Sequence, residues 1–134
     1  MKFIFFSSFL LLTILTFSCR HESVHERIAR QTSEFSRTSC PKRMDDYTVL
    51  DSMVYNSSET TMLYYYSVCD KLDNDSVYND VFINVFYTDL LNNLKDNLGL
   101  LELKKNNVHF KYVYYSSITK KTYMNFMFTA DDYK

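Results

Sequence analysis

Residues 108–128 read VHFKYVYYSSITKKTYMNFMF. Apolar and aromatic side chains stand at every second position in both halves of this stretch, a period of two that is typical of half-buried strands. The connection over residues 116–121 is short, so the two halves can pair antiparallel. The stretch therefore predicts a β-hairpin. One face of it would be formed by Val108, Phe110, Tyr112, Tyr114, Met124, Phe126 and Phe128, and the other would begin with His109, Lys111, Val113 and Tyr115.

A second hairpin is predicted nearer the N-terminus. The segments Thr48–Tyr55 and Thr61–Val68 are rich in Thr, Val, Tyr and Met, and the residues between them, Asn56–Glu59, are typical of a turn. The chain has only 1 Gly and 1 Pro, so its turns must be made by Asn, Asp and Ser, whose side chains form local hydrogen bonds.

A helix is predicted between the two hairpins, over Val77–Leu98. The alternative is a strand, because residues 81–87 (VFINVFY) are rich in β-branched and aromatic side chains. The period of their apolar positions does not distinguish a helix from a strand. The helix is favoured because Asp89–Asn97 extends it with good helix formers, with Asp75 or Ser76 as its cap and Gly99 as its end. Its apolar positions are Val77, Val81, Val85, Leu91, Leu94 and Leu98.

An earlier helix is predicted within the polar segment Arg20–Thr38, which starts as a flexible tether. The spacing of one narrow helical face supports it, and Pro41 ends it. The order α, β, β, α, β, β then predicts an α+β fold with a four-stranded antiparallel sheet, formed by the two hairpins, and with the N-terminal and central helices packed on one face. The narrow face consists of Val24, Ile28, Gln31 and Phe35.

The first residues predict export. A basic residue is followed by an apolar run and a small residue before Cys19, so residues 1–18 are interpreted as a signal peptide. Residues 15–19 (LTFSC) resemble the lipobox of bacterial lipoproteins, although Leu is one place early and Phe17 is bulky. The resemblance implies that Cys19 carries fatty acyl chains such as palmitate and anchors the protein in a lipid bilayer. The alternative is cleavage near Ser18, which would release a soluble secreted protein.

The domain organisation follows from this anchor. Residues 19–38 are expected to form a lipid-anchored tether and helix, and residues 39–134 a compact α+β domain. Arg20, and not Asp, follows the modified Cys, which by resemblance to enterobacterial sorting favours the outer membrane. The formal net charge of −1 does not predict nucleic-acid binding.

Cys40 and Cys69 are predicted to form a disulfide. One precedes the first strand and the other ends the second, and the exported compartment is oxidising. Closing about thirty residues would stabilise the fold by roughly 3 to 4 kcal/mol. The alternative is a pair of free, buried thiols.

Catalytic and metal-binding patterns are weak. Residues 21–25 (HESVH) match the zinc pattern H-E-x-x-H, but a zinc site needs a third protein ligand, and we interpret the match as chance on a solvated helix. Asp45, Asp46 and Asp51 are interpreted as surface carboxylates, with Asp51 pointing outward. We expect no catalytic residue, no metal and no cofactor. A tyrosine set is interpreted as cross-strand packing, with ligand stacking as the alternative; it comprises Tyr64, Tyr65, Tyr66, Tyr112, Tyr114 and Tyr115.

The segment from Cys40 to Val68 resembles a group of small exported bacterial lipoproteins of unknown function, with a Cys-Pro, Thr-x-Leu-Asp-Ser and Tyr-x-Tyr pattern. The resemblance implies an α+β fold and gives no activity. Where those proteins often have a Gly turn in the last hairpin, this chain has residues 118–121. The matching residues are Cys40, Pro41, Asp45 or Asp46, Thr48, Leu50, Asp51, Ser52, Tyr64 and Tyr66.

Three functions remain at this point. The favoured hypothesis is a non-enzymatic, membrane-tethered lipoprotein of a Gram-negative envelope, with a binding or structural role. The second is a secreted inhibitor or immunity-type protein that binds one protein partner through an exposed edge or groove. The third is a small hydrolase, for which only Cys40 or Cys69 with His109 could supply a nucleophile and base.

Overall fold

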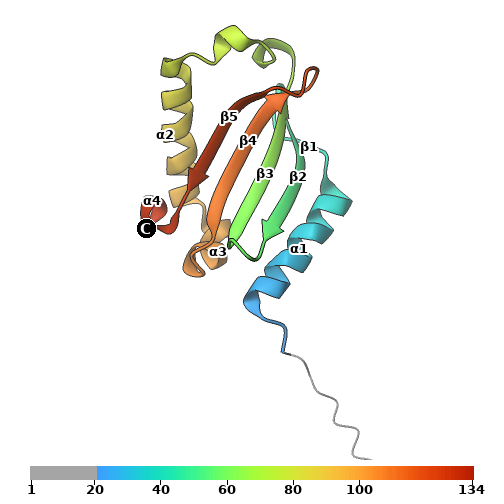
Figure 1. Cartoon of the computed structure of the whole chain (residues 1–134), viewed down its shortest axis with the longest axis vertical. Coiled ribbons are helices and arrows are strands. Elements are labelled where there is room, and N and C mark those ends of the chain that lie inside the picture. Colours follow the sequence, from blue (N-terminus) through green and yellow to red (C-terminus); the bar gives the residue numbers. More distant parts are fainter. Residues whose placement is uncertain (1–20) are drawn as a thin grey trace, which may run out of the picture.

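The computed structural model describes residues 21–134, so Cys19 and the signal peptide lie outside the described residues. The helices and strands are arranged around one sheet (Figure 1). In chain order they are α1 (Val24–Ser39), β1 (Lys42–Arg43), β2 (Thr48–Asn56), β3 (Thr61–Val68), η1 (Asp70–Leu72), η2 (Asp75–Val77), α2 (Asp80–Asp96), η3 (Leu98–Leu100), α3 (Leu101–Lys105), β4 (His109–Ser116), β5 (Thr122–Phe128) and α4 (Ala130–Tyr133).

The sheet is five-stranded and mixed, so the prediction of a four-stranded antiparallel sheet is wrong. Both hairpins, β2–β3 and β4–β5, are antiparallel as predicted, but β3 and β4 pair in parallel, with Thr61 opposite His109 and Val68 opposite Ser116. The fifth strand is β1, which pairs antiparallel with the start of β2. With only two residues, β1 is too short to give a periodic pattern in the sequence.

The parallel pairing follows from the length of α2. Its 17 residues span about 25 Å at a rise of 1.5 Å per residue, and the 8 residues of β3 span about 26 Å. The helix therefore returns the chain along the whole strand, and β4 starts at the same end of the sheet as β3. A crossover of this kind is how parallel neighbours are joined.

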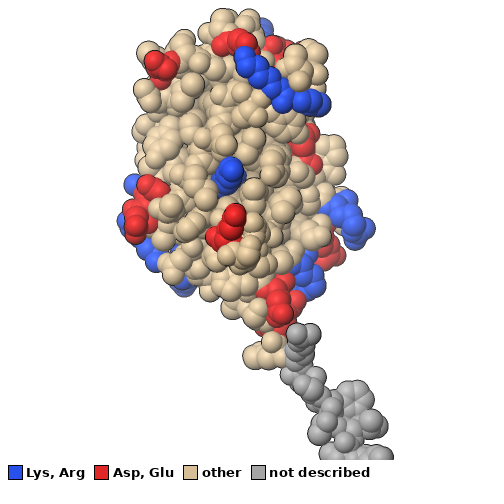
Figure 2. Space-filling view, viewed as in Figure 1, with Lys and Arg blue, Asp and Glu red and all other residues tan. Residues whose placement is uncertain are grey.

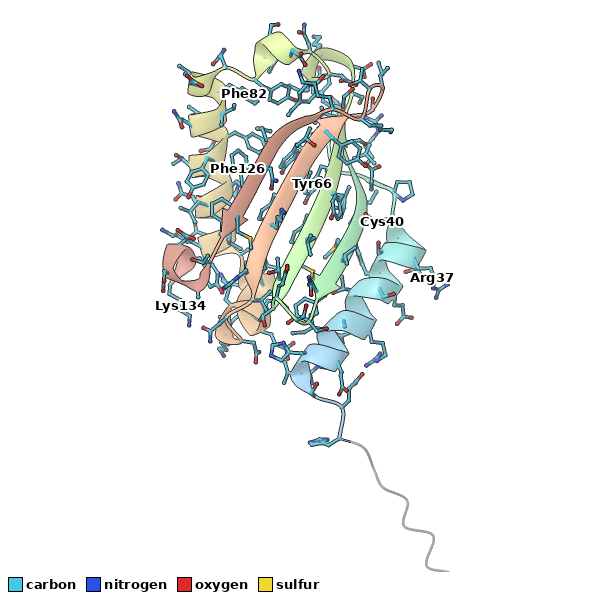
Figure 3. All side chains as sticks on the ribbon, viewed as in Figure 1. Arg37, Cys40, Tyr66, Phe82, Phe126 and Lys134 are labelled. Atoms are coloured by element: carbon cyan, nitrogen blue, oxygen red, sulfur yellow. The ribbon has the colours of Figure 1, made fainter. Side chains whose placement is uncertain are left out.

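The core lies between one face of the sheet and the helices. The alternating residues of β4 and β5 that were predicted to share a face are buried, and Val108, Phe110 and Phe128 are fully enclosed. Phe86 of α2 packs its ring edge against Tyr114 and also stacks on Phe126, which Figure 3 shows between the sheet and α2. Helix α2 thus covers the β4–β5 half of this face.

Helix α1 begins with a capping box and packs on the other half of the sheet. The Ser23 side chain accepts a hydrogen bond from the Glu26 N–H, and the Glu26 carboxylate accepts one from the Ser23 N–H. Ile28 and Thr32 are buried against β2 and β3, whereas Phe35 of the predicted face is 36% exposed. Residues 24–39 therefore belong to the packed domain, which shortens the expected tether.

The central helix is confirmed, but its ends differ from the predicted ones. Asn79 caps its first turn by accepting from the Phe82 N–H, and Asn97 ends it. Gly99 lies within η3 and has no positive φ. The short asparagine side chain can bond to neighbouring backbone groups, so asparagine takes the role that glycine often has at helix ends.

Among residues 21–134, four residues other than Gly adopt positive φ at turns, with angles between 50° and 63°; they are Thr60, Asp70, Asn107 and Lys120. Thr60 and Lys120 lie at the turns of the two hairpins. The β4–β5 turn is held by Asp73, whose carboxylate accepts from the Ser117 hydroxyl at 3.0 Å and the Tyr123 hydroxyl at 2.9 Å. Hydrogen bonding to Ser116, and then to Tyr123 and Ser117, lowers the pKa of Asp73.

Within the described part of the chain, no helix has the length and apolar character needed to span a bilayer.

Candidate interaction surface on the open face of the sheet

The second face of the sheet is not covered by a helix of the described chain. Side chains of a strand alternate between faces, so the neighbours of the core residues point to this side. Most of them are partly or fully exposed, although Thr61 and Ser67 are buried, and Val54 and Met127 are 48% and 44% exposed. We call this surface the open face. Its members include Val54, Leu63, Tyr65, Lys111, Val113, Tyr115, Asn125 and Met127.

Charged side chains are sparse on the open face. Figure 2, viewed as Figure 1, shows a wide, largely uncharged area over the sheet, with most of the visible charges at its margin. Apolar and tyrosine side chains dominate this area. An exposed surface of this composition on one side of a small domain often marks an interaction site.

A shallow hollow of about 500 Å³ lies on the open face near the β4–β5 turn. At its side the Tyr115 hydroxyl donates to the Asp51 carboxylate at 2.5 Å, and the Lys120 ammonium lies 5.6 Å from the centre of the Tyr115 ring. Burial, together with the hydrogen bond and charge of Asp51, raises the pKa of Tyr115 to about 12. Tyr115 is therefore a neutral donor at physiological pH. The lining residues are Ser52, Tyr65, Val113, Tyr115, Lys120 and Thr122.

Asp51 reaches this position because β2 carries a bulge there. The register with β3 shifts between Leu50 and Ser52, and a bulge redirects the side chain of the extra residue. Leu50 stays buried in the core, while Asp51 bonds to Tyr115 of β4, 64 positions away in sequence. The prediction that Asp51 points away from the core is confirmed.

A groove of about 480 Å³ adjoins the hollow and runs between α1 and the outer edge of β2. Small residues of α1 leave it open: Ala29, Ser33 and Ser36. Beyond β1 the edge of β2 has no strand partner in the described chain. The Met53 N–H donates to the Ser36 hydroxyl at 3.1 Å across the groove, so backbone groups of this edge point towards α1.

The tyrosine set is divided between the two faces. On the core face Tyr64 stacks on Tyr112 with ring centroids 4.9 Å apart, and Tyr66 stacks on Tyr114 at 4.8 Å. These four are paired across strands as predicted, and burial raises the pKa of each. Tyr65 and Tyr115 point to the open face and remain accessible to a partner.

The other acidic and histidine candidates are not brought together. Asp45 accepts from the Tyr47 N–H in a local turn, and Asp46 uses its backbone carbonyl to accept from Arg43. His25 bonds to the Tyr55 hydroxyl at 2.6 Å, which engages one of the two histidines of the zinc pattern. Among residues 21–134 no cluster of three or more His, Cys, Asp or Glu is placed to hold a metal ion.

The predicted disulfide is not formed: Cys40 and Cys69 are both free. Strand β1 is the reason. It carries Cys40 to the outer side of β2, as Figure 3 shows, whereas Cys69 follows β3 on the inner side. Because β2 lies between them, the two segments that carry Cys40 and Cys69 are separated by two strand spacings, about 10 Å. A disulfide bridges Cα atoms only up to ~7 Å apart. Burial raises the pKa of the Cys40 thiol.

The candidate nucleophile–base pairs are also separated. His109 is paired with Thr61 at one end of β3, and Cys69 follows the other end, a distance of roughly 25 Å along the strand. Cys40 bonds to Ser36 and lies near Asp51, in the part of β2 that is farther from His109. The structure brings neither thiol within hydrogen-bond reach of His109.

Two parts of this surface were not predicted from the sequence. The first is the groove, because the small residues of α1 have no apolar pattern. The second is the hollow, because Lys120 and Thr122 belong to a turn and a strand end for which the sequence predicted only a structural role. The alternating positions of β4, with Val113 and Tyr115 opposite the core residues, were the sequence signal for the open face.

The fold defines an α+β domain of one helix-covered mixed sheet. Residues 23–124 match the family described as "Domain of unknown function (DUF8479)", and the chain belongs to this family. A crystal structure of a Pseudomonas aeruginosa protein, described as a "putative secreted protein", has a similar fold with a TM-score of 0.64 and 13% sequence identity; the match covers 84% of this chain and 92% of that one. No curated protein matches the chain in sequence.

Proposed function

We propose that this protein is exported to the envelope of a Gram-negative bacterium, is anchored in a membrane through lipid on Cys19, and binds a protein partner through its open face without catalysing a reaction. The lipobox-like residues 15–19 support the anchor. Similarity in fold to a protein described as a "putative secreted protein" supports the export.

The open face is the observation that carries the binding role. The central part of a protein interface is depleted of charged residues and enriched in Tyr and Met, and this face has that composition with Tyr65, Tyr115 and Met127. Asp51 and Lys120 at the hollow add polar groups that would orient a partner. The described helices cover only the other face of the sheet, so the apolar side chains of the open face are exposed to water. A protein partner on this surface would bury them.

The absence of catalysis is part of the proposal. It is supported by the separation of Cys40 and Cys69 from His109 and by the structural role of Asp51, whose carboxylate is occupied by the Tyr115 hydroxyl. A nucleophile needs a base within hydrogen-bond reach, about 2.6–3.2 Å.

The anchor is tested by comparing the wild type with Cys19→Ala in the native host. We expect the wild type in the membrane fraction with incorporated fatty acid, and the variant either uncleaved or released. A wild type that fractionates as soluble and carries no labelled fatty acid would refute the anchor.

The binding role is tested by affinity capture from envelope fractions with three forms of the protein. Met127→Asp places a charge on the open face, where Met127 is 44% exposed, whereas Val81→Asp places one on the exposed side of α2, where Val81 is 74% exposed. We expect one stoichiometric protein to be captured by the wild type and by Val81→Asp and to be lost with Met127→Asp. Capture that is the same for all three forms would exclude the open face as the binding surface.

The groove beside β2 favours a second candidate function, that of a secreted inhibitor or immunity-type protein. Its unpaired strand edge could accept an extended segment of one partner as an additional strand. Capture that is lost with Ser33→Trp, which fills the groove, and retained with Met127→Asp, on β5 and away from the groove, would favour this function.

A further inference from the structure

One end of the domain gathers the start of α1, the short helix α3 and the C-terminal helix α4. Figure 1 shows these elements at the same end of the sheet, where the chain leaves towards residue 20. An ion pair between Arg27 and Glu102 joins the first part of α1 to α3. We call this part of the molecule the anchor end, and the β4–β5 turn lies at the opposite end of the sheet.

Exposed leucines lie at the anchor end. Leu98 of η3 is 80% exposed and Leu101 of α3 is 44% exposed. Both lie in the short connection that follows α2; Leu101 is partly covered, whereas Leu98 is largely open to solvent. A leucine that is four-fifths exposed gains nothing from folding, so its apolar surface is available to a contact outside the domain.

Lysines lie beside Leu101. A hollow of about 260 Å³ is lined by Leu101, Lys104, Lys105, Tyr133 and Lys134, and Figure 3 shows Lys134 at this end beside α4. Two of the lysines are partly engaged. Lys104 donates to the carbonyls of Leu94 and Lys95 and so caps α2, and Lys134 bonds to Asn107. Acidic side chains are also present at this end. Glu102 and Glu22 form ion pairs with Arg27 and Arg30, and Glu26 and Asp132 accept hydrogen bonds in the caps of α1 and α4. Asp96 ends α2 and Asp131 lies in α4.

The chain before α1 keeps this end close to the anchor. Val24 lies five positions after Cys19, and an extended chain spans at most about 3.3–3.6 Å per residue, or roughly 18 Å here. The remaining residues of the expected tether are folded in α1, which packs on the sheet through Ile28. A domain held on so short a connection remains near the surface of the bilayer.

We infer that the anchor end rests on the bilayer that holds the anchor, with Leu98 and Leu101 in the headgroup region and Lys104, Lys105 and Lys134 against anionic phospholipids. This inference rests on the proposed lipid anchor. Apolar side chains flanked by lysines favour the interface of an anionic membrane. In this orientation the strands run away from the membrane and the open face stays free for a partner.

The test uses the full-length lipidated protein in vesicles of phosphatidylcholine with phosphatidylglycerol, in vesicles of phosphatidylcholine alone, and in detergent. A membrane-impermeant amine reagent labels exposed lysines, and mass spectrometry gives the rate at each. We expect Lys105 to label at least about threefold more slowly in the anionic vesicles than in detergent, because lysines near an anionic surface are held there. Lys71, in η1 at the opposite end, should label equally in both.

Matched variants assign the effect to the leucines. Leu98→Asp should abolish the protection of Lys105, whereas Ile118→Asp, which changes a residue with the same 80% exposure in the β4–β5 turn, should leave it intact. Equal labelling of Lys105 in vesicles and detergent, with the protein still floating with the vesicles, would overturn the inference and leave the anchor standing. Failure of the wild type to float with vesicles would overturn both. Equal protection in the two kinds of vesicle would exclude the role of the lysines.

Discussion

The assignment of the two faces of β5 can be tested at two adjacent residues. Phe128 has no exposed surface and packs against Tyr87, with ring centroids 5.0 Å apart, and against Tyr112 at 6.0 Å. Met127, the preceding residue, lies on the open face and is 44% exposed. We predict that Phe128→Ala strongly destabilises the protein and that Met127→Ala barely does so.

The magnitude follows from the packing. Removing a fully buried phenylalanine costs about 3–5 kcal/mol through lost transfer energy and the cavity that remains, and the two ring contacts place Phe128 in the upper part of this range. Met127 loses only part of a half-exposed side chain, so we expect about 0.5 kcal/mol. A domain of this size has a free energy of unfolding of about 5–15 kcal/mol, so Phe128→Ala removes a large share of it.

Equilibrium unfolding in urea, followed by far-UV circular dichroism, measures both changes. If Phe128→Ala does not fold, Phe128→Leu provides a milder substitution, for which a loss of about 1–1.5 kcal/mol is expected. Equal losses at the two positions, or a larger loss at Met127, would refute the register of β5, because a slip of one residue exchanges the two faces.

Three further predictions concern turns, caps and pH. Thr60→Asn should raise the free energy of unfolding by about 1 kcal/mol, since a β-branched residue at φ 50° is strained, and an unchanged urea midpoint would contradict this. Ser23→Ala should lower it by about 1 kcal/mol because the N-terminal cap of α1 is lost; helix content and urea midpoint provide the measurement. The pKa of Asp73 is lowered in the folded state, chiefly by Ser116, so its contribution is present above the unfolded value of about 3.9 and is lost as the pH falls through the folded value. Asp73→Asn should therefore lower stability at pH 7 and weaken the decline of stability with acid, and a decline as steep as in the wild type would argue against this role.

Much of the secondary structure could be predicted from local pattern. The second strand, Thr61–Val68, was predicted with its observed ends, and the buried face of the last hairpin was predicted through Phe110 and Phe126. The central helix was also predicted, although asparagines and not Gly99 set its end. These features depend on periods of two and 3.6 residues, which neighbouring residues in the chain establish by themselves.

The candidate site was predicted less well. The sequence indicated that Asp51 points outward, but its hydrogen bond to Tyr115 joins positions that are 64 residues apart. The expected disulfide failed for a similar reason, because the proximity of Cys40 and Cys69 was inferred from a hairpin without β1 on its outer edge.

The sequence by itself determined the longer strands, the two long helices and the buried face of the last hairpin. Lipid attachment at Cys19 stays a prediction from the sequence. Only the tertiary structure decided that β3 and β4 run parallel, that β1 joins the sheet, and that one face of the sheet remains open. Local periodicity specifies which side of a strand is apolar, but the partner and direction of each strand depend on how far α2 returns the chain. That distance is a property of the packed chain as a whole, and it places Asp51 beside Tyr115 on the open face.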